Sequence, residues 1–218
     1  YSDSSERGEE IIGRYKSYLA DILTLSGHSD GRGAAQRIFA LESQLAEHQW
    51  NKIDNRDADK RYNKMSAAEF IAMLSNLDME SYLQGIGIDL PETVIVVQPS
   101  YLTAFNQLFT TVGVDSWKDY LRANVLSSYA SFLPSAFVET RFDFYSKFLY
   151  GRQEQQPRWR KAVNSINGNL GELLGQLYVA KHFSPDSKAR MNTMVDNLIA
   201  AYAESIKNLD WMSAETKQ

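Results

Sequence analysis

The sequence predicts an all-α fold, a multi-helix domain that covers residues 1–218. Two observations favour this fold class: apolar residues recur at spacings of three and four through most of the chain, and residues typical of helix starts precede several of these stretches. A third observation qualifies it. The clearest β-branched run, Val94–Val97, is short and lies between Pro91 and Pro99, which leaves one extended segment at 94–97 open within the helical fold.

The first half of the chain begins with two amphipathic stretches. The first stripe ends just before Gly27, where a helix is expected to stop, and consists of Ile11, Ile12, Tyr15, Leu19, Ile22 and Leu23. The second stripe consists of Ile38, Leu41 and Leu45. Residues 54–64 are highly charged and are interpreted as a connection. The sequence Ser66-Ala67-Ala68-Glu69 after it is typical of a capping box at a helix start.

The second half predicts further helices at 100–112, 116–132, 134–150 and 157–181. Pro134 and Pro157 suit a first helical turn, where the missing amide hydrogen costs nothing. The last long helix has Ser184 as its N-cap and Pro185 after it, and it carries a long apolar stripe. Residues 151–157 are interpreted as a loop inside one compact domain, so a single domain over 1–218 is expected.

Composition removes several classes of function. The formal charge of −4 gives no basic surface for nucleic acid, so no nucleic-acid partner is expected. The absence of cysteine excludes disulfides and thiolate zinc sites. The uncharged run at 93–114 is too polar to span a membrane. The polar start at Tyr1 lacks the apolar segment of a signal peptide and suggests a piece of a longer protein.

No metal-binding or catalytic set of side chains is found in the sequence. A zinc peptidase needs two histidines four residues apart on one helix, with a glutamate as general base. His28, His48 and His182 lie in unrelated segments instead. The stretch with Asp54, Asp57 and Asp59 lacks the glycine and glutamate of a calcium loop, and a solvated, ion-paired turn is expected there. The sequence therefore predicts no catalytic residue, metal ligand or cofactor of its own.

Several stretches together resemble the neprilysin-type zinc metallopeptidases, the family of neprilysin and the endothelin-converting enzymes. The resemblance covers nearly the whole chain in the same order, although no single stretch is specific. It rests on Tyr15-x-x-Tyr18 with Leu23-x-Leu25-x-Gly27, Ile38 to Ala46, Arg56-Asp57, Tyr62-Asn63-Lys64-Met65, Arg158-Trp159-Arg160, Gly175 to Val179, and Leu209 to Lys217 with Trp211-Met212. Ala162 stands where the animal enzymes tend to have cysteine, which indicates a bacterial member.

The resemblance implies that this chain is the N-terminal accessory domain, a lid that restricts entry to a zinc endopeptidase site. The zinc and the catalytic residues of such a parent lie in a C-terminal catalytic domain of the same polypeptide, and its substrates are oligopeptides in an enclosed cavity. The chain alone is then inactive. The resemblance also implies a cell-envelope or extracellular location, with the cytoplasm left open. The alternative is a free-standing helical module that binds peptides or proteins without catalysis.

Five residues are expected at a structural or interdomain junction: Arg56, Asp57, Tyr62, Asn63 and Trp211. The first four match family positions on a polar connection, where an ion-paired, hydrogen-bonded junction is expected, either inside this domain or facing the catalytic domain. A purely internal turn is an equal alternative for them. Trp211 follows the last long helix and is expected to anchor the crossing into the catalytic domain.

Overall fold

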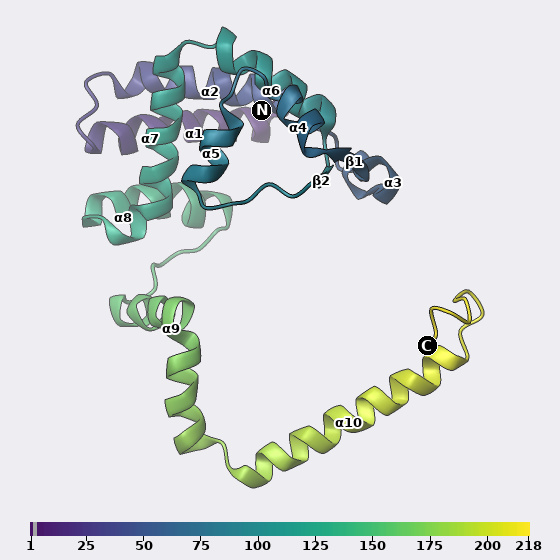
Figure 1. The fold of residues 1–218 in the computed structure, drawn as a ribbon. Coiled ribbons are helices and arrows are strands. Elements are labelled where there is room, and N and C mark those ends of the chain that lie inside the picture. The colour runs from purple at the N-terminus through teal and green to yellow at the C-terminus, as the bar shows by residue number, and fades with distance from the viewer. Residues whose placement is uncertain (2–3) are drawn as a thin grey trace. The chain divides into compact units, whose positions relative to one another are not determined.

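The computed structural model describes Tyr1 and residues 4–218, and the described residues form ten α-helices and one two-stranded sheet (Figure 1). The predicted all-α fold class is confirmed. The chain divides into two compact units, unit 1 (Tyr1–Glu154) and unit 2 (Gln155–Gln218). The single domain over 1–218 stays a prediction.

Unit 1 is built on an antiparallel pair of helices, α1 (Glu6–Leu25) and α2 (Gly31–Glu47). Each helix starts at a side-chain cap: the Ser5 hydroxyl accepts from the amide of Gly8, and the Asp30 carboxylate accepts from the amide of Gly33. Gly27 has φ +83°, a conformation that glycine adopts without strain, and it stops α1 at the expected place. The two predicted stripes are thereby confirmed as helices.

The core of unit 1 lies between these two helices and the later helices that cover them. Ile22 and Ile38 are completely buried at its centre. Aromatic rings extend it, since Tyr18 contacts both Phe144 and Tyr145 with ring centroids 5.3 Å apart. The buried cluster consists of Tyr18, Leu19, Ile22, Leu23, Ala34, Ala35, Ile38, Ala123, Ala130 and Phe144.

The covering helices differ from the two that were predicted at 116–132 and 134–150. The first is α7 (Val114–Tyr129), followed by a 3₁₀ turn, η2 (Ala130–Phe132). The second is α8 (Ser135–Arg141), which continues as a π-helix, η3 (Phe142–Leu149). A π-helix places more residues in each turn than an α-helix. This wider turn lets two adjacent aromatic residues of η3, Phe144 and Tyr145, reach the core. The spacing of hydrophobic residues in the sequence does not predict such a π-helix.

A small antiparallel sheet lies in the stretch that was interpreted as a charged connection. Strand β1 (Asn63–Ser66) pairs with β2 (Thr93–Val96), with Asn63 opposite Val96 and Ser66 opposite Thr93. The extended segment predicted at 94–97 is thus confirmed as strand β2, whose bounds lie one residue earlier. The interpretation of 54–64 as a plain connection is wrong, because it also holds the short helices η1 (Asp54–Arg56) and α3 (Ala58–Arg61).

Three further helices complete unit 1: α4 (Ala67–Met73), α5 (Met79–Gly85) and α6 (Pro99–Thr111). The predicted capping box at the start of α4 is confirmed, since the hydroxyl of Ser66 accepts from the amide of Glu69 and the Glu69 carboxylate accepts from the amide of Ser66. This cap begins α4 directly after β1, so that sheet and helix are connected without a loop.

Unit 2 consists of two long helices, α9 (Arg158–His182) and α10 (Pro185–Lys207). Pro157 and Pro134 are N-cap residues rather than first-turn residues, whereas the predicted Ser184 cap and Pro185 first turn of α10 are confirmed. Helix α9 is kinked at Leu170, whose φ and ψ are −130° and 25°. None of the helices in the described part of the chain is long and apolar enough to cross a membrane.

Candidate functional site

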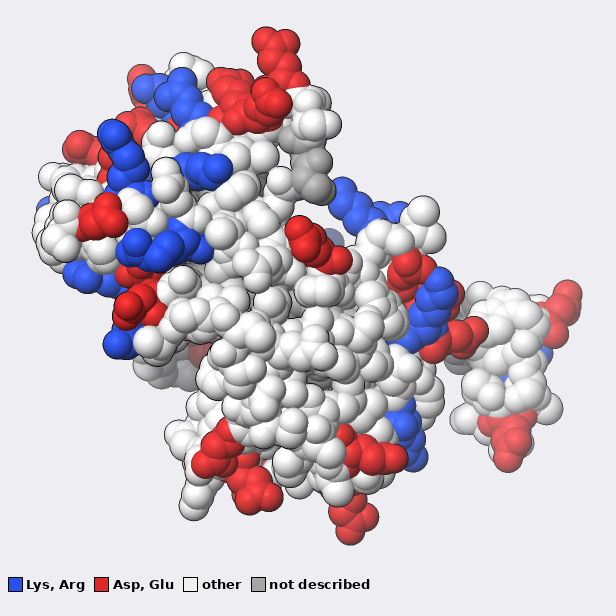
Figure 2. Space-filling view, turned by 90° about the horizontal axis from the view of Figure 1, so that it is seen from above, with Lys and Arg blue, Asp and Glu red and all other residues white. Residues whose placement is uncertain are grey.

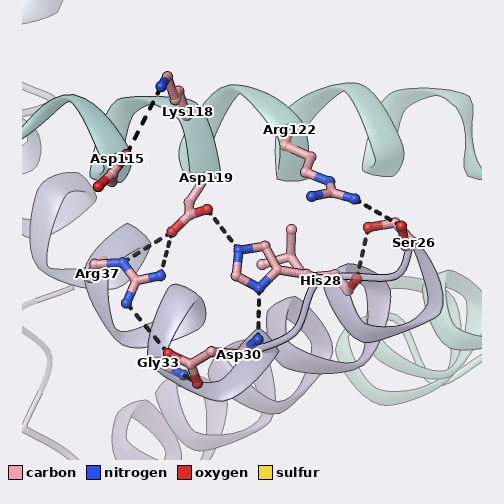
Figure 3. A network of polar contacts seen from close by, with 10 residues as sticks. Ser26, His28, Asp30, Gly33, Arg37, Asp115, Lys118, Asp119 and Arg122 are labelled. Atoms are coloured by element: carbon pink, nitrogen blue, oxygen red, sulfur yellow. Dashed lines mark hydrogen bonds and ion pairs between the residues drawn. The ribbon is translucent and has the colours of Figure 1, made fainter.

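A network of hydrogen bonds and ion pairs in unit 1 surrounds Asp119 on α7 (Figure 3). Asp119 is 7% exposed, and both of its carboxylate oxygens are engaged. Oδ1 lies 3.0 Å from Nε2 of His28, and Oδ2 accepts from Nη2 and Nε of Arg37 at 2.7 and 3.0 Å. One carboxylate therefore joins three segments, namely the α1–α2 loop, α2 and α7.

The hydrogen bonds of His28 define which of its ring nitrogens carries the proton. The backbone amide of Asp30 donates to Nδ1 at 3.0 Å, so Nδ1 presents its lone pair to that amide. Nε2 therefore carries the proton and donates it to Asp119. Because both nitrogens are engaged, His28 has no lone pair for a metal ion or for general-base catalysis.

A hollow of about 440 Å³ opens beside this network. Its lining is almost entirely charged and consists of His28, Arg37, Asp115, Lys118, Asp119 and Arg122. All three of these cations have partners, and Lys118 lies 4.0 Å from Oδ1 of Asp115. Hydrogen bonds to Asp119 raise the pKa of Arg37, and Arg122 donates to the carbonyl of Ser26 at 2.8 Å. The charges of these cations and carboxylates offset each other. The ion pairs and hydrogen bonds that line the hollow connect the α1–α2 loop, α2 and α7, and the lining residues include no nucleophile.

A second polar group, Glu42 on α2, lies partly buried among aromatic residues. The Tyr15 hydroxyl donates to Oε1 at 2.9 Å, while Oε2 is buried and has no hydrogen-bond partner among the described residues. Burial raises the pKa of Glu42, a feature often seen in catalytic acids. The cavity beside it, however, measures about 30 Å³, which is room for roughly one water molecule and none for a peptide.

The charged side chains on the face seen in Figure 2 do not form a continuous basic surface. Lys and Arg are interleaved with Asp and Glu around its margins, and a broad central area carries neither. Among the described residues, no three His, Asp or Glu side chains lie together so that they could hold a metal ion. His48 is the C-cap residue of α2 and His182 is the last residue of α9, so the donor set present does not fit a zinc site.

Four of the five predicted junction residues lie in the stretch from η1 to β1. Asp57 caps α3 by accepting from the amides of Asp59 and Lys60, at 3.0 and 3.1 Å. Asn63 donates to the carbonyl of Val96 at 3.0 Å and thereby ties β1 to β2. These two side chains bind within unit 1.

The other three predicted junction residues are exposed. Arg56 lies on the surface, Tyr62 is 60% exposed and Trp211, in unit 2, is 78% exposed. The ion pair of this stretch joins Lys60 to Asp54 rather than Arg56 to Asp57. The network around Asp119 was not predicted, because its members lie up to 91 residues apart and no local spacing connects them.

Replacement of Asp119 by alanine is expected to lower the free energy of unfolding by about 2 kcal/mol, because Arg37 and His28 lose a charged acceptor in a largely buried position. Denaturant unfolding of the 218-residue chain measures this. The matched control is Asp115→Ala on the same helix, whose side chain is 84% exposed, with an expected change within about 0.5 kcal/mol. Equal effects of the two substitutions would contradict a structural role for the network.

Comparison with known proteins extends over the whole chain. The N-terminal sequence profile of peptidase family M13 matches residues 1–218. Endothelin-converting enzyme-like 1 of Mus musculus is 27% identical over 222 residues, covering 100% of this chain and 28% of that protein. Neutral endopeptidase of Lactobacillus helveticus is 26% identical over 192 residues, covering 88% of this chain and 30% of that protein.

Among solved structures, zinc metalloprotease Zmp1 of Mycobacterium tuberculosis in its open state has the same fold, with a TM-score of 0.81 and 34% identity. The match covers 99% of this chain and 34% of that one. This chain thus spans about a third of the length of its relatives. Matched from end to end by the family's N-terminal profile, the chain belongs to peptidase family M13, the zinc-dependent, neprilysin-like metallopeptidases.

Proposed function

We propose that this chain is the N-terminal accessory part of a zinc metalloendopeptidase that hydrolyses oligopeptides, and that it gates access to the catalytic site. The family match over residues 1–218 carries this proposal. It is supported by the length of the relatives, about three times that of this chain, which leaves room for a catalytic portion in the same polypeptide.

The chemistry of the described residues supports placing catalysis in that further portion. A zinc-bound water molecule needs imidazole or carboxylate ligands that converge on one point. Here His28 is committed to Asp119 and Asp30, and Asp119 is committed to Arg37. The family match supports zinc in the parent protein, and we place the bond cleavage in its further portion.

A gating role fits the physical character of unit 1. Enclosing a hydrolytic site excludes folded proteins by size, so that flexible peptides alone reach the metal. Such a lid requires a rigid body, and the buried cluster between α1, α2 and α7 supplies one. The relative Zmp1 was solved in an open state, which supports an opening lid in the parent of this chain.

The second candidate function is a free-standing helical module that binds peptides. A groove of about 290 Å³ next to β2 favours it, lined by apolar residues of β2, α4 and α6 that include Phe70, Ile95 and Tyr101. Such a groove suits one or two side chains of an extended peptide.

For the parent protein, the resemblance supports the cell envelope or extracellular space as its location.

Arg56 and Tyr62 are proposed as the residues of the predicted junction that contact the catalytic portion. Both are exposed, and no hydrogen bond or ion pair joins either side chain to another described residue. Asp57 and Asn63 hold the stretch in shape from within, through the α3 cap and the β1–β2 link. Trp211 is proposed as an anchor at the crossing out of unit 2.

The native gene product is expected to be far heavier than 24.8 kDa and to contain one zinc ion per chain. An antibody raised against this chain, used on the source cells, measures the mass, and metal analysis of the captured protein measures the zinc. A product of about 24.8 kDa without zinc would withdraw the peptidase function in favour of the binding module.

In the full-length protein, Tyr62→Ala is expected to reduce kcat/KM about tenfold, the equivalent of one interface contact of about 1.4 kcal/mol. The same substitution is expected to leave the melting temperature of the 218-residue chain unchanged, because Tyr62 is exposed there. Lys52→Ala, at an exposed position two residues before η1, is the control for general surface effects. Loss of stability in the 218-residue chain itself would place Tyr62 in the internal structure of unit 1 and contradict the junction.

A further inference from the structure

Unit 2 is amphipathic throughout but has no core of its own. Among residues 155–218, no side chain is buried, and neither α9 nor α10 contains a buried residue. Two helices whose apolar faces remain in water are not stable, because helices in proteins depend mainly on the packing of such faces. Unit 2 by itself therefore needs a further surface to cover these apolar faces.

The apolar face of α10 is a continuous stripe. Its largest side chains recur at spacings of three and four, so they lie along one side of the helix. They are about half exposed and consist of Met191 (46%), Met194 (53%), Val195 (46%), Leu198 (52%) and Tyr202 (61%). The opposite side carries polar or small residues, among them Thr193, Asp196 and Lys207. The two sides thus differ as those of a helix at a protein interface do.

Helix α9 has a second stripe, with successive spacings of four, three, four, three and four residues. It consists of Trp159 (64%), Val163 (44%), Ile166 (46%), Leu170 (53%), Leu173 (60%) and Leu177 (71%). The kink at Leu170, between Gly168 and Gly171, divides this stripe into two straight halves. Alternating spacings of three and four are typical of helices that pack against other helices, and an extended peptide does not match them.

We infer that α9 and α10 belong structurally to the catalytic body, and that their apolar stripes pack against helices of the polypeptide beyond Gln218. The boundary between the gating part and the catalytic body then lies in the loop at 150–157, where the contacts within the chain divide and Gly151 turns with φ +70°. This inference rests on the proposed function, because it takes the missing portion to be the catalytic one.

The length of the relatives favours this occupant over a second copy of the chain. In them about two thirds of the polypeptide lies outside the matched segment. A partner on the same polypeptide is present at an effective concentration in the millimolar range for short connections. It therefore outcompetes a second copy for the same apolar stripes.

Photo-cross-linking in the full-length protein tests the inference. The probe is p-benzoyl-phenylalanine, placed at Tyr202 on the apolar stripe, where it replaces one aromatic ring with another. The matched control carries the same probe at Thr193, on the opposite side of α10. Mass spectrometry of the digested product identifies the cross-linked peptide. The expected result is a cross-link from position 202 to residues beyond Gln218, and at least a fivefold lower yield from position 193.

Three outcomes would overturn the inference: a cross-link from position 202 into residues 1–154, a cross-link between two copies, or equal yields from both positions. Zinc content and peptide hydrolysis, measured on the protein before irradiation, separate it from the proposed function. If the protein is an active zinc enzyme but position 202 cross-links into residues 1–154, the proposed function stands and the inference about α9 and α10 is wrong. If a longer protein without zinc or activity cross-links from position 202 to residues beyond Gln218, the packing inference stands and the peptidase function is wrong.

Discussion

The packing of α2 against α1 is the contact on which the rest of unit 1 depends. At Gly31 the start of α2 comes so close to α1 that an added Cβ would lie 2.3 Å from Oγ1 of Thr24 and 2.6 Å from the carbonyl oxygen of Ala20. A side chain there would force the helices apart, and Ile22 and Ile38, both completely buried, would lose their contacts. Asp119 then fixes α7 across the end of this pair where the loop joins α1 to α2, through His28 and Arg37.

The local parts of this fold follow from the sequence. Ser66 and Ser184 cap the helices that they were expected to start, and Gly27 ends α1, because each of these effects acts within a few residues. Strand β1 could not be predicted in the same way. Its sequence, Asn63-Lys64-Met65-Ser66, has no β-branched residue and forms a strand because β2, thirty residues later, pairs with it.

The candidate site was harder to predict from the sequence than the fold. His28, Arg37 and Asp119 come from three elements, and nothing in their spacing shows that one carboxylate binds the other two. The junction residues were predicted from a resemblance to a family rather than from chemistry. Their side chains show little that would mark them as a site. Asp57 and Asn63 form hydrogen bonds within unit 1. The side chains of Arg56, Tyr62 and Trp211 are exposed.

The two units differ in the contacts that stabilise them. Unit 1 has a closed core, whereas unit 2 has apolar stripes and no buried side chain. Hydrogen–deuterium exchange of the α10 amides, compared between the 218-residue chain and the full-length protein, tests this most directly. We expect rapid exchange in the chain alone and strong protection in the full-length protein, with α1 protected in both. Equal protection of α10 in the two proteins would contradict this expectation.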